Sequence, residues 1–573
     1  MRNGEIAEAF EELASLYELD GAVVYRVVAY RNAAKAIRDS GVSVEEMARQ
    51  GRVEELSGVG KTIAEKIDAL LETGSIPSAD KLKAKIPAGL VEITRIPGLG
   101  PKRAKLLHDH LGVSSLDDLR RAAEDGSLKD VPGFGRKAEE NVLATLAAGA
   151  DGRPRERVLL SRALAVGEEM VASLRAHPAA LRVELAGSAR RRADTVKDLD
   201  IVAASSDPAA LSEAFVALDA IDVVGNSGEA GAKAVTHSGL AVDLRIVPSE
   251  AFGNLLQHFT GSGKHNEALR TEAVRRGLHV SEYGISDDES GQTEAFTTEE
   301  EVYQRLGMAY VPPELREDRG ELEAARRGEL PKLVELDDLR GDLHMHTTLS
   351  DGRNSLPEMV EGARERGYEY VAITDHSASH GFGDDVPPDV LRSRIEEIRA
   401  LDDLGIRVLA GTETNVLPDG TLDYDDDVLS ELDWVVASLH TSFRLSEAEQ
   451  TERMMRAMEH PLVDVIGHPT GRLIGRREPY AIDLDRVIAK AVETGTFLEI
   501  NGNPDRRDLN DVYARAAVEA GVTIMIDSDS HGVDTLANIR YGVATARRAW
   551  LTAENVGNTH SWDELRKLRK RGE

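Results

Sequence analysis

The sequence predicts a multidomain protein of mixed α+β and α/β class, with a helical N-terminal region, a central mixed sheet and a C-terminal β/α barrel. Its 573 residues suffice for several domains at roughly 150 residues each. Short amphipathic segments separated by glycine turns fill residues 1–150, and strand-like runs alternate with helical ones over 151–250. From about residue 338, strand-like runs that mostly end in His, Asp or Glu alternate with helical stretches, which is typical of a β/α barrel.

The composition limits the classes of protein that this chain can belong to. Hydrophobic residues make up 41% and charged residues 30%, which is enough to build packed cores. No apolar run approaches the roughly 20 residues that cross a bilayer, and the acidic start MRNGEIAEAFEEL lacks the apolar core of a secretory signal. Cysteine is absent, which excludes disulfides, thiolate zinc sites and cysteine nucleophiles. We therefore expect a cytoplasmic protein without a membrane partner.

The net charge of −31 arises from 101 acidic and 70 basic residues, and arginine outnumbers lysine about three to one. This balance favours a surface adapted to high salt, as in a halophilic organism, and an ordinary acidic enzyme is the alternative. Residues 1–150 are nearly neutral, with 21 basic and 24 acidic side chains. A DNA-binding surface is therefore compatible with the N-terminal region.

Three glycine turns share one pattern, and each precedes a helical segment with basic residues. A turn of this kind frees backbone N–H groups at the start of the second helix, where they can bind a phosphate, and nearby lysines or arginines add charge. A tight helix connection is the alternative for any single copy. The pattern resembles the helix-hairpin-helix motif, and it places candidate DNA-binding glycines at Gly58 and Gly60 in LSGVGK, Gly98 and Gly100 in IPGLGP, and Gly133 and Gly135 in VPGFGR.

The central region carries acidic residues in a pattern that indicates metal binding. Asp198 and Asp200 alternate along one predicted strand and project to one face, and Asp243 lies on a later strand. Three clustered carboxylates repel one another unless divalent cations neutralise them, which predicts a two-metal site. Gly187 and Ser188, upstream of these acids, could bind terminal phosphate oxygens. An isolated pair of strand-end aspartates is more often solvated, but the ordered set resembles the nucleotidyltransferase superfamily.

The segment HFTGSGKHN, residues 258–266, makes the resemblance more specific. Over the first 320 residues the chain is similar to family X (beta-like) DNA polymerases. The resemblance implies that Asp198, Asp200 and Asp243 bind catalytic Mg²⁺ or Mn²⁺. It also implies that Ser188 and Arg191 contact the nucleotide triphosphate. His258 stands where the family usually has tyrosine. Of the remaining matched nucleotide-binding positions, Gly187 lies with Ser188 at the phosphates, Phe259, Thr260 and Gly261 lie beside the sugar, and Asn266 lies at the minor groove.

A lysine in the N-terminal region is a candidate nucleophile. In family members that remove a 5′-deoxyribose phosphate, a lysine forms a Schiff base with the sugar, and Lys66 matches that position, with Tyr30 as a supporting residue. Arg26 replaces an expected lysine. We therefore favour the simpler interpretation, in which Lys66 contacts a DNA phosphate.

The C-terminal region contains the strongest metal-binding pattern. Nitrogen and oxygen donors follow successive predicted strands, where a barrel gathers its active site, and such donors suit zinc, manganese or iron. Bound metals would activate water and neutralise a phosphate for hydrolysis. The candidate ligands are His344, His346, Asp351, His376, Glu413, His440, His468, Asp529 and His531.

This series resembles the polymerase-and-histidinol-phosphatase (PHP) domain over about 235 residues. The resemblance implies that all nine candidate ligands bind up to three Mn²⁺, Zn²⁺ or Fe²⁺ ions, with Glu413 as a bridge, and that the domain is a 3′–5′ exonuclease. Phosphatase activity at 3′ ends or cleavage at abasic sites could accompany it. A group of arginines could hold a DNA backbone or merely face solvent. These are Arg472, Arg476, Arg477, Arg506 and Arg507.

As a whole, the chain resembles the beta-like polymerases of bacteria and archaea that are fused to a PHP domain. The expected partners are dNTPs and DNA with gaps, primers or 3′ ends, and the expected state is a monomer. Three alternatives remain: a repair nuclease with a weak palm, a DNA-end-binding protein without catalysis, and a small-molecule phosphatase. The expected regions are a lyase-like helical domain with a helix-hairpin-helix (1–85), a fingers-like region (86–150), a nucleotidyltransferase palm (151–255), a thumb (256–320), a linker (321–337) and the PHP β/α barrel (338–573).

Overall fold

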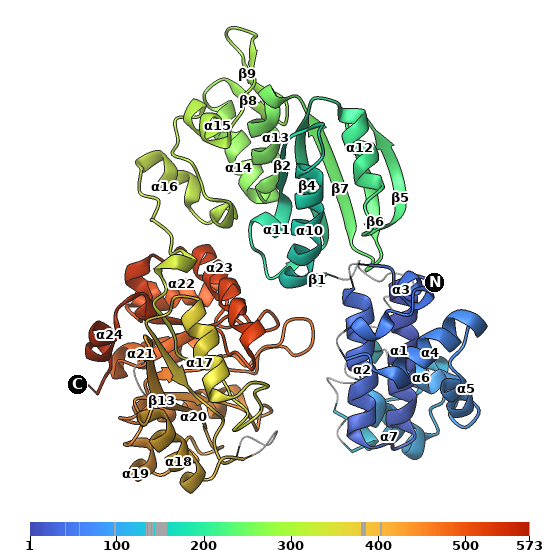
Figure 1. Cartoon of the computed structure of the whole chain (residues 1–573), viewed down its shortest axis with the longest axis vertical. Helices are drawn as coiled ribbons and strands as arrows, with labels where there is room; N and C mark the ends of the chain where they lie inside the picture. Colours follow the sequence, from blue (N-terminus) through green and yellow to red (C-terminus); the bar gives the residue numbers. More distant parts are fainter. Residues whose placement is uncertain are drawn as a thin grey trace. The chain divides into compact units, whose positions relative to one another are not determined.

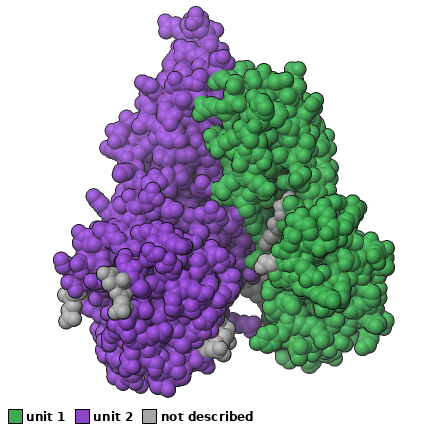
Figure 2. All heavy atoms as spheres, in the orientation of Figure 1, with its two compact units in different colours: residues 1–158, 162–185, 197–249 green, residues 159–161, 186–196, 250–573 purple. Residues whose placement is uncertain are grey.

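The computed structural model describes residues 1–571 except 41, 57, 95, 97–98, 133, 136–138, 140–141, 144–156, 380–384 and 402–403. It divides into two compact units (Figure 2). The first unit comprises residues 1–158, 162–185 and 197–249, and the second comprises 159–161, 186–196 and 250–573. Segment 186–196 of the predicted palm thus belongs to the second unit, and the predicted domain boundaries stay predictions. No helix among the described residues is long and apolar enough to cross a membrane.

The N-terminal part of the first unit is helical, as predicted (Figure 1). In its first helix Ile6, Phe10 and Leu13 are fully buried, because this spacing places them on one face. The elements are α1 (Asn3–Leu19), α2 (Val24–Asp39), α3 (Val44–Arg49), η1 (Val53–Glu55), α4 (Lys61–Thr73), α5 (Pro77–Lys83), α6 (Ala88–Thr94), α7 (Pro101–Leu111), α8 (Leu116–Glu124) and η2 (Ser127–Asp130).

The remainder of the first unit is built on a five-stranded mixed sheet, which confirms the predicted central sheet. Its strand order is β2 (Ala180–Leu185), β4 (Asp198–Ser205), β7 (Ala241–Val247), β6 (Gly231–Thr236) and β5 (Ile221–Gly228). Strands β4 and β7 are parallel, and the other pairs are antiparallel. Helix α12 (Pro208–Val216) packs on β4 to β7, and α10 (Leu160–Arg175) precedes β2.

The second unit begins at the boundary strand β1 with short elements, which include a small antiparallel sheet in the order β10-β9-β8. A buried cluster that includes Leu269, Val302 and Val311 forms the core of the elements from α14 onward. The elements are β1 (Val158–Leu159), α11 (Gly187–Arg190), β3 (Thr195–Val196), η3 (Ser249–Ala251), α13 (Phe252–Thr260), α14 (Gly263–Val274), β8 (Leu278–Ser281), β9 (Gly284–Asp287), β10 (Thr293–Glu294), α15 (Glu299–Arg305), η4 (Pro313–Leu315) and α16 (Glu321–Arg327).

Seven parallel strands form the largest part of the second unit, in the order β11 to β17. A parallel bridge between Met345 and Ser530 brings the last strand beside the first, so the sheet nearly closes into the predicted barrel. The strands are β11 (Gly341–Asp342), β12 (Tyr370–Ile373), β13 (Arg407–Asn415), β14 (Trp434–Ser438), β15 (Val465–Ile466), β16 (Phe497–Asn501) and β17 (Ile524–Asp527).

Helices follow the barrel strands along the chain, as a β/α barrel requires. Strand residues such as Val371, Val435 and Ile526 are buried and pack with apolar helix residues in one continuous core. The helices are η5 (Leu336–Asp338), α17 (Leu356–Glu365), α18 (Pro388–Arg399), α19 (Asp426–Leu429), α20 (Glu447–Glu459), α21 (Leu484–Thr494), α22 (Asp511–Ala520), η6 (Val533–Asn538), α23 (Ile539–Arg548), η7 (Ala553–Asn555), η8 (Gly557–Thr559) and α24 (Trp562–Leu568).

Candidate metal centres and nucleic-acid-binding elements

The predicted metal ligands of the barrel gather at the carboxyl ends of its strands. All seven strands contribute polar side chains there, because parallel strands present their carboxyl ends at one rim. They are His344 and His346 after β11, His376 after β12, Glu413 on β13, His440 after β14, His468 after β15, Glu499 on β16, and Asp529 and His531 after β17.

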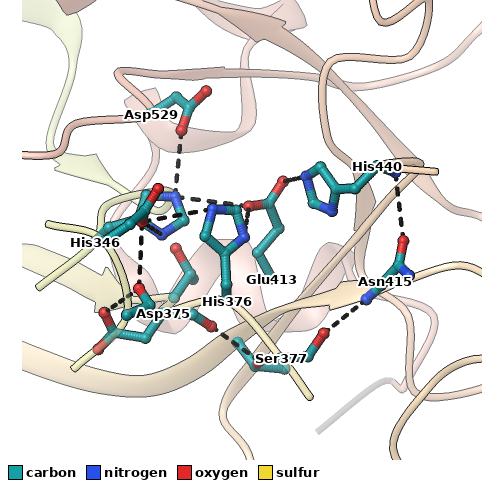
Figure 3. A network of polar contacts seen from close by, with 12 residues as sticks. His346, Asp375, His376, Ser377, Glu413, Asn415, His440 and Asp529 are labelled. Atoms are coloured by element: carbon teal, nitrogen blue, oxygen red, sulfur yellow. Dashed lines mark hydrogen bonds and ion pairs between the residues drawn. The ribbon is translucent and has the colours of Figure 1, made fainter. Parts of the chain in front are cut away.

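Three groups of these side chains place their ligand atoms within 4.8 Å of one another. The first group is His346, Asp351, His376 and His531, the second is His344, His346 and Asp529, and the third is His376, Glu413 and His440. Figure 3 shows His346, His376 and His440 arranged around Glu413, with Asp529 beside His346. These groups share His346 and His376 and could bind metal ions, while the number of ions stays a prediction.

Glu413 is the central carboxylate of this arrangement. Its Oε1 lies 2.9 Å from Nε2 of His468 and 3.1 Å from Nε2 of His440. Its Oε2 lies 2.9 Å from Nδ1 of His376 and 3.3 Å from Nε2 of His344. Each oxygen therefore faces a different pair of imidazoles, and Glu413 lies at the centre of the candidate ligands.

The buried donor atoms of the barrel fit divalent cations. Nε2 of His344, both ring nitrogens of His346 and Oε2 of Glu413 are buried and, although they lie close to one another or to other candidate ligands, make no hydrogen bond of regular geometry within the described part of the chain. A buried polar atom without a partner costs about 1–3 kcal/mol, so several in one place indicate a ligand. Imidazole nitrogens and carboxylate oxygens suit manganese, zinc and iron.

The electrostatics of the site keep most ligands in the form that binds a metal. Burial, together with the neighbouring rings of His531 and His376, lowers the pKa of His346 to about 3. Burial and the charge of Arg506 likewise lower the pKa of His468 to about 3. Both imidazoles are therefore neutral at physiological pH, as metal ligation requires. Burial opposes protonation of His531, but its hydrogen bond to Asp351 outweighs that effect and raises its pKa to about 9.

Glu499 belongs to the site although the sequence did not single it out. Its Oε1 lies 2.7 Å from Nδ1 of His344, and Asn501 Nδ2 donates both to Oε2 of Glu499 (3.1 Å) and to Oδ2 of Asp529 (3.0 Å). A carboxylate on the second imidazole nitrogen fixes the tautomer and the orientation of a metal-binding histidine. The strand run TFLEING carries the same signal as its neighbours, an acidic residue near the strand end, and could have revealed Glu499.

A Glu499→Gln variant is expected to bind Mn²⁺ about 10- to 100-fold more weakly than the parent protein, because His344 loses its orienting carboxylate. The gain in thermal midpoint produced by Mn²⁺ should shrink accordingly, since stabilisation by a ligand depends on its concentration relative to its Kd. Differential scanning fluorimetry against Mn²⁺ concentration measures this shift. Glu493→Gln, which changes an exposed carboxylate paired with Lys490, is the control and should respond like the parent. An equal response of the two variants would contradict the role of Glu499.

In the first unit, the three predicted palm carboxylates lie on adjacent strands. Asp200 on β4 is the direct register partner of Asp243 on β7, and Asp198 lies two residues before Asp200. All three are partly exposed, whereas Leu199 between the first two is fully buried. Asp243 pairs with Lys233 and Arg245, each at 3.2 Å. The 4.8 Å metal-site groups found among the described residues are all in the barrel, so the palm carboxylates are adjacent without converging so closely.

The predicted nucleotide-binding residues Gly187, Ser188 and Arg191 form a turn at α11 in the second unit. Gly187 has φ +62°, a left-handed conformation that favours glycine. Arg191 is already engaged: its Nε lies 3.0 Å from Glu317 Oε1, and its Nη1 donates to the carbonyl of Thr260 at 2.8 Å. The Arg191 guanidinium is thus paired in this structure, and its contact with a triphosphate stays a prediction.

The turn between α13 and α14 contains the other predicted nucleotide contacts. Asn266 Nδ2 donates to the carbonyl oxygen of His258 at 2.7 Å and of Gly261 at 3.3 Å, so the amide closes the turn. A Cβ at Gly261 would lie only 2.4 Å from Asn266 Oδ1, which explains the glycine. The ring of His258 lies 5.6 Å from that of Phe259, while Thr260 is fully buried. Burial lowers the pKa of His258.

The glycine turns of the first unit precede helices where they are described. Gly58 has φ +80°, Gly60 is the N-cap of α4, and Gly100 is the N-cap of α7. Gly135 is exposed and its carbonyl accepts a hydrogen bond from Glu139 N. Gly98 and Gly133 lie outside the described residues.

The candidate lyase residues lie on α2 and α4. Lys66 is a partly exposed residue of α4. Tyr30 is buried and stacks on Tyr17 at 5.4 Å, while Arg26 lies over the Tyr17 ring. Tyr30 therefore packs in the helical core, and the lyase assignment of Lys66 stays a prediction.

Two of the arginines that we considered for DNA binding pair with one carboxylate. The Arg507 side chain is 1% exposed and pairs with Asp194 at 3.1 Å, and Arg472 pairs with the same carboxylate at 2.9 Å. The Arg507 guanidinium is therefore engaged inside the protein, which contradicts a DNA-backbone role for it, whereas the Arg472 side chain is 13% exposed and its contact with DNA stays a prediction. Arg477 stacks on Phe443 at 4.4 Å, and Arg476 pairs with Asp505.

Family models match four parts of the chain. A helix-hairpin-helix domain matches residues 1–76, and a SAM-like helix-hairpin-helix tandem matches residues 90–148. The DNA polymerase beta thumb matches residues 255–317, and the PHP domain matches residues 342–503. The predicted hairpins, thumb and PHP barrel are thereby confirmed.

Known proteins are similar to the whole chain or to part of it. The Bacillus subtilis (strain 168) protein named "DNA polymerase/3'-5' exonuclease PolX" is 38% identical over 577 residues, which span 100% of both chains. A protein of Thermoanaerobacter sp. (strain X514) named "Probable phosphatase" is 31% identical over 237 residues, or 38% of this chain and 89% of its own length. Nothing in these comparisons supports salt adaptation, which stays a prediction. The full-length relative and the family models together show that the chain belongs to the family X DNA polymerases that carry a C-terminal PHP domain.

Proposed function

We propose that this protein is a template-directed DNA polymerase that fills short gaps during repair, and that its barrel is a metal-dependent 3′–5′ exonuclease. The observation that carries the proposal is the complete set of nine ligands at the barrel rim, in the same chain as a polymerase thumb and helix-hairpin-helix regions. The name of the full-length relative pairs the same two activities. A small-molecule phosphatase does not need the thumb or the hairpins.

For polymerisation, we assign Asp198, Asp200 and Asp243 to hold Mg²⁺ or Mn²⁺. These ions, when bound, neutralise the triphosphate and lower the pKa of the attacking 3′-hydroxyl. The adjacency of Asp200 and Asp243 in the β4–β7 register supports the assignment. Gly187, Ser188 and Arg191 bind the triphosphate, while Asn266 and the segment 258–261 contact the base and sugar of the incoming nucleotide.

For hydrolysis, the nine barrel ligands would hold up to three ions, for which Mn²⁺ is our first assignment and Zn²⁺ or Fe²⁺ the alternatives. Bound ions supply an activated water and neutralise the phosphodiester at a 3′ end. The chain contributes the neutral imidazoles of His346 and His468 and the carboxylates of Glu413 and Asp529. Removal of 3′-phosphates and cleavage at abasic sites are further activities of the same centre.

For DNA binding, we assign the backbone N–H groups that follow the glycine turns. Gly60 and Gly100 stand at the N-caps of α4 and α7, where free N–H groups can bind backbone phosphates. Such contacts fix position without reading sequence, which suits an enzyme that acts at any gap. Lys66, on α4, adds charge to the same contact.

A single primer assay tests both activities. A 5′-labelled primer in a gapped duplex is incubated with the protein and Mn²⁺, with and without dNTPs. We expect extension with dNTPs and shortening without them. Shortening alone would assign the protein to the nucleases with a vestigial palm, and extension alone would make the barrel metals structural. Absence of both reactions would contradict the proposed function.

A further inference from the structure

Residues 187–194 form a turn that contains the proposed triphosphate ligands, and we call it the triphosphate turn. Arginines from the barrel hold this turn directly. Arg507, between β16 and α22, donates from Nη2 to the carbonyl oxygen of Arg192 at 2.9 Å and pairs through Nη1 with Asp194 at 3.1 Å. Arg548, the last residue of α23, donates from Nη1 to the carbonyl oxygen of Arg191 at 2.8 Å. The barrel thus binds both the backbone and a side chain of the turn.

These contacts are buried. The side chains of Arg507 and Arg548 are 1% and 8% exposed, so their charges need partners: Asp194 of the turn pairs with Arg507, and Glu317 and Asp511 pair with Arg548. Burial lowers the pKa of Arg507 to about 10, which leaves its guanidinium charged at neutral pH. Two buried guanidinium groups, of which Arg507 is charged at neutral pH, therefore lie against the turn within the second unit.

The backbone on both sides of the contact is held in an uncommon conformation. Arg192 has φ 58° and Arg507 has φ 47°, which is the left-handed region that non-glycine residues rarely adopt. Such conformations persist where surrounding contacts impose them, and they cluster at functional sites. The hydrogen bond from Arg507 to the Arg192 carbonyl oxygen joins these two positions.

Arg548 also shares a carboxylate with a proposed triphosphate ligand. Glu317 Oε1 lies 3.0 Å from Nε of Arg191 and 2.9 Å from Nη1 of Arg548. If Arg191 turns toward a triphosphate, Glu317 keeps Arg548 as its partner, so a half-buried carboxylate is not left uncompensated. Without Arg548, the same movement would leave Glu317 unpaired and would hold Arg191 back.

We infer that Arg548 and Arg507 are positioning residues for DNA synthesis. Both arginines hold the triphosphate turn in shape, and Arg548 gives Glu317 a second cation. Arg191 can then leave Glu317 and bind the incoming nucleotide. This inference rests on the proposed polymerase function. It makes the barrel a structural part of the nucleotide site in addition to its role in hydrolysis. The same loop reaches the metal centre, since Nε of the neighbouring Arg506 lies 3.4 Å from Oδ2 of Asp529.

The test compares two adjacent arginines of α23 in the full chain. Arg548→Gln removes the ion pairs with Glu317 and Asp511 and the charged donor to the turn, whereas Arg547→Gln removes pairs with Glu314 and Glu335 and leaves the turn untouched. Single-nucleotide gap filling at a series of dNTP concentrations gives kcat and KM. For Arg548→Gln we expect the dNTP KM to rise about 10-fold with kcat nearly unchanged. When Arg191 turns to the nucleotide in this variant, Glu317 is left without a cation, and this cost falls on nucleotide binding rather than on the chemical step. Arg547→Gln should retain the parent KM.

A double variant separates positioning from general damage. In Glu317→Gln with Arg548→Gln, no carboxylate remains to hold Arg191, so the KM should fall back toward that of the parent. Exonuclease activity without dNTPs should stay near the parent level in all three variants, which shows that the barrel is folded. If Arg548→Gln does not fold, Arg548→Lys is used instead. It retains the charge but cannot contact both the Arg191 carbonyl oxygen and Glu317 as arginine does, so its KM should exceed that of the parent by less than 10-fold.

Three results would overturn the inference: an unchanged KM in Arg548→Gln (or in Arg548→Lys where that variant replaces it), an equal rise in Arg547→Gln, or a double variant that is worse than Arg548→Gln alone. Failure of the parent protein to extend the primer would instead contradict the proposed function. The two failures are therefore distinguishable in one set of assays.

Discussion

A Glu413→Gln variant is expected to lose at least about 1,000-fold of the exonuclease rate, equivalent to roughly 4 kcal/mol of transition-state stabilisation. The glutamine is isosteric, so it removes the charge without creating a cavity. Glu413 is the carboxylate that all three metal-site groups approach: its two oxygens lie within 3.3 Å of His344, His376, His440 and His468. Loss of that charge weakens every neighbouring metal position at once.

The measurement is shortening of a 5′-labelled single strand with Mn²⁺ and without dNTPs. Gap filling by the same variant should stay within about two-fold of the parent rate, because no proposed palm ligand changes. Glu431→Gln, at a surface glutamate that pairs with Arg392, is the matched control and should retain both activities. Exonuclease activity that survives in Glu413→Gln would show that the barrel centre is not the hydrolytic site.

The gathering of the candidate barrel ligands could be predicted from the sequence because the strands of a parallel barrel all end at one rim. Residues that follow different strands, such as His376 and His440, therefore lie close together although they are far apart in the chain. Period-two alternation likewise placed Asp198 and Asp200 on one face of a strand. Local pattern and strand order together determine these contacts.

The arginine contacts could not be predicted in that way. A charged side chain is expected at the surface, and only a distant partner makes its burial tolerable. Arg507 finds such a partner in Asp194, which lies in a turn encoded far earlier in the chain. No local signal distinguishes Arg507 from Arg506, whose side chain is 18% exposed.

The backbone conformation at two candidate ligands could not be predicted from the sequence either. His468 and Asp529 have φ values of 30° and 53°, although neither is glycine. Such strain is imposed by packing around a functional site and leaves no mark in composition or periodicity. Glu499 is a different case, since its strand-end position gave a usable signal.

An Asp200→Asn variant is expected to lose DNA synthesis and to keep exonuclease activity, the reverse of Glu413→Gln. This change should reduce primer extension by at least about 1,000-fold, since a two-metal site that loses a shared carboxylate loses roughly 4 kcal/mol of charge stabilisation in the transition state. Asp200 lies beside Asp243 as its register partner on the neighbouring strand β7, so an amide there changes the acidic pair while the isosteric side chain preserves the sheet. The nine barrel ligands are unchanged, and exonuclease activity should remain.

Asp222→Asn is the matched control for this variant, because Asp222 lies on β5 of the same sheet and pairs with His237 at 3.6 Å. It should extend the primer at the parent rate. Extension by Asp200→Asn at a rate close to that of Asp222→Asn would place nucleotidyl transfer elsewhere and would contradict the palm assignment. If Asp200→Asn loses only extension and Glu413→Gln loses only shortening, two chemically independent centres in one chain account for synthesis and degradation at a 3′ end. A loss of both activities in either variant would instead mean that one centre depends on the other.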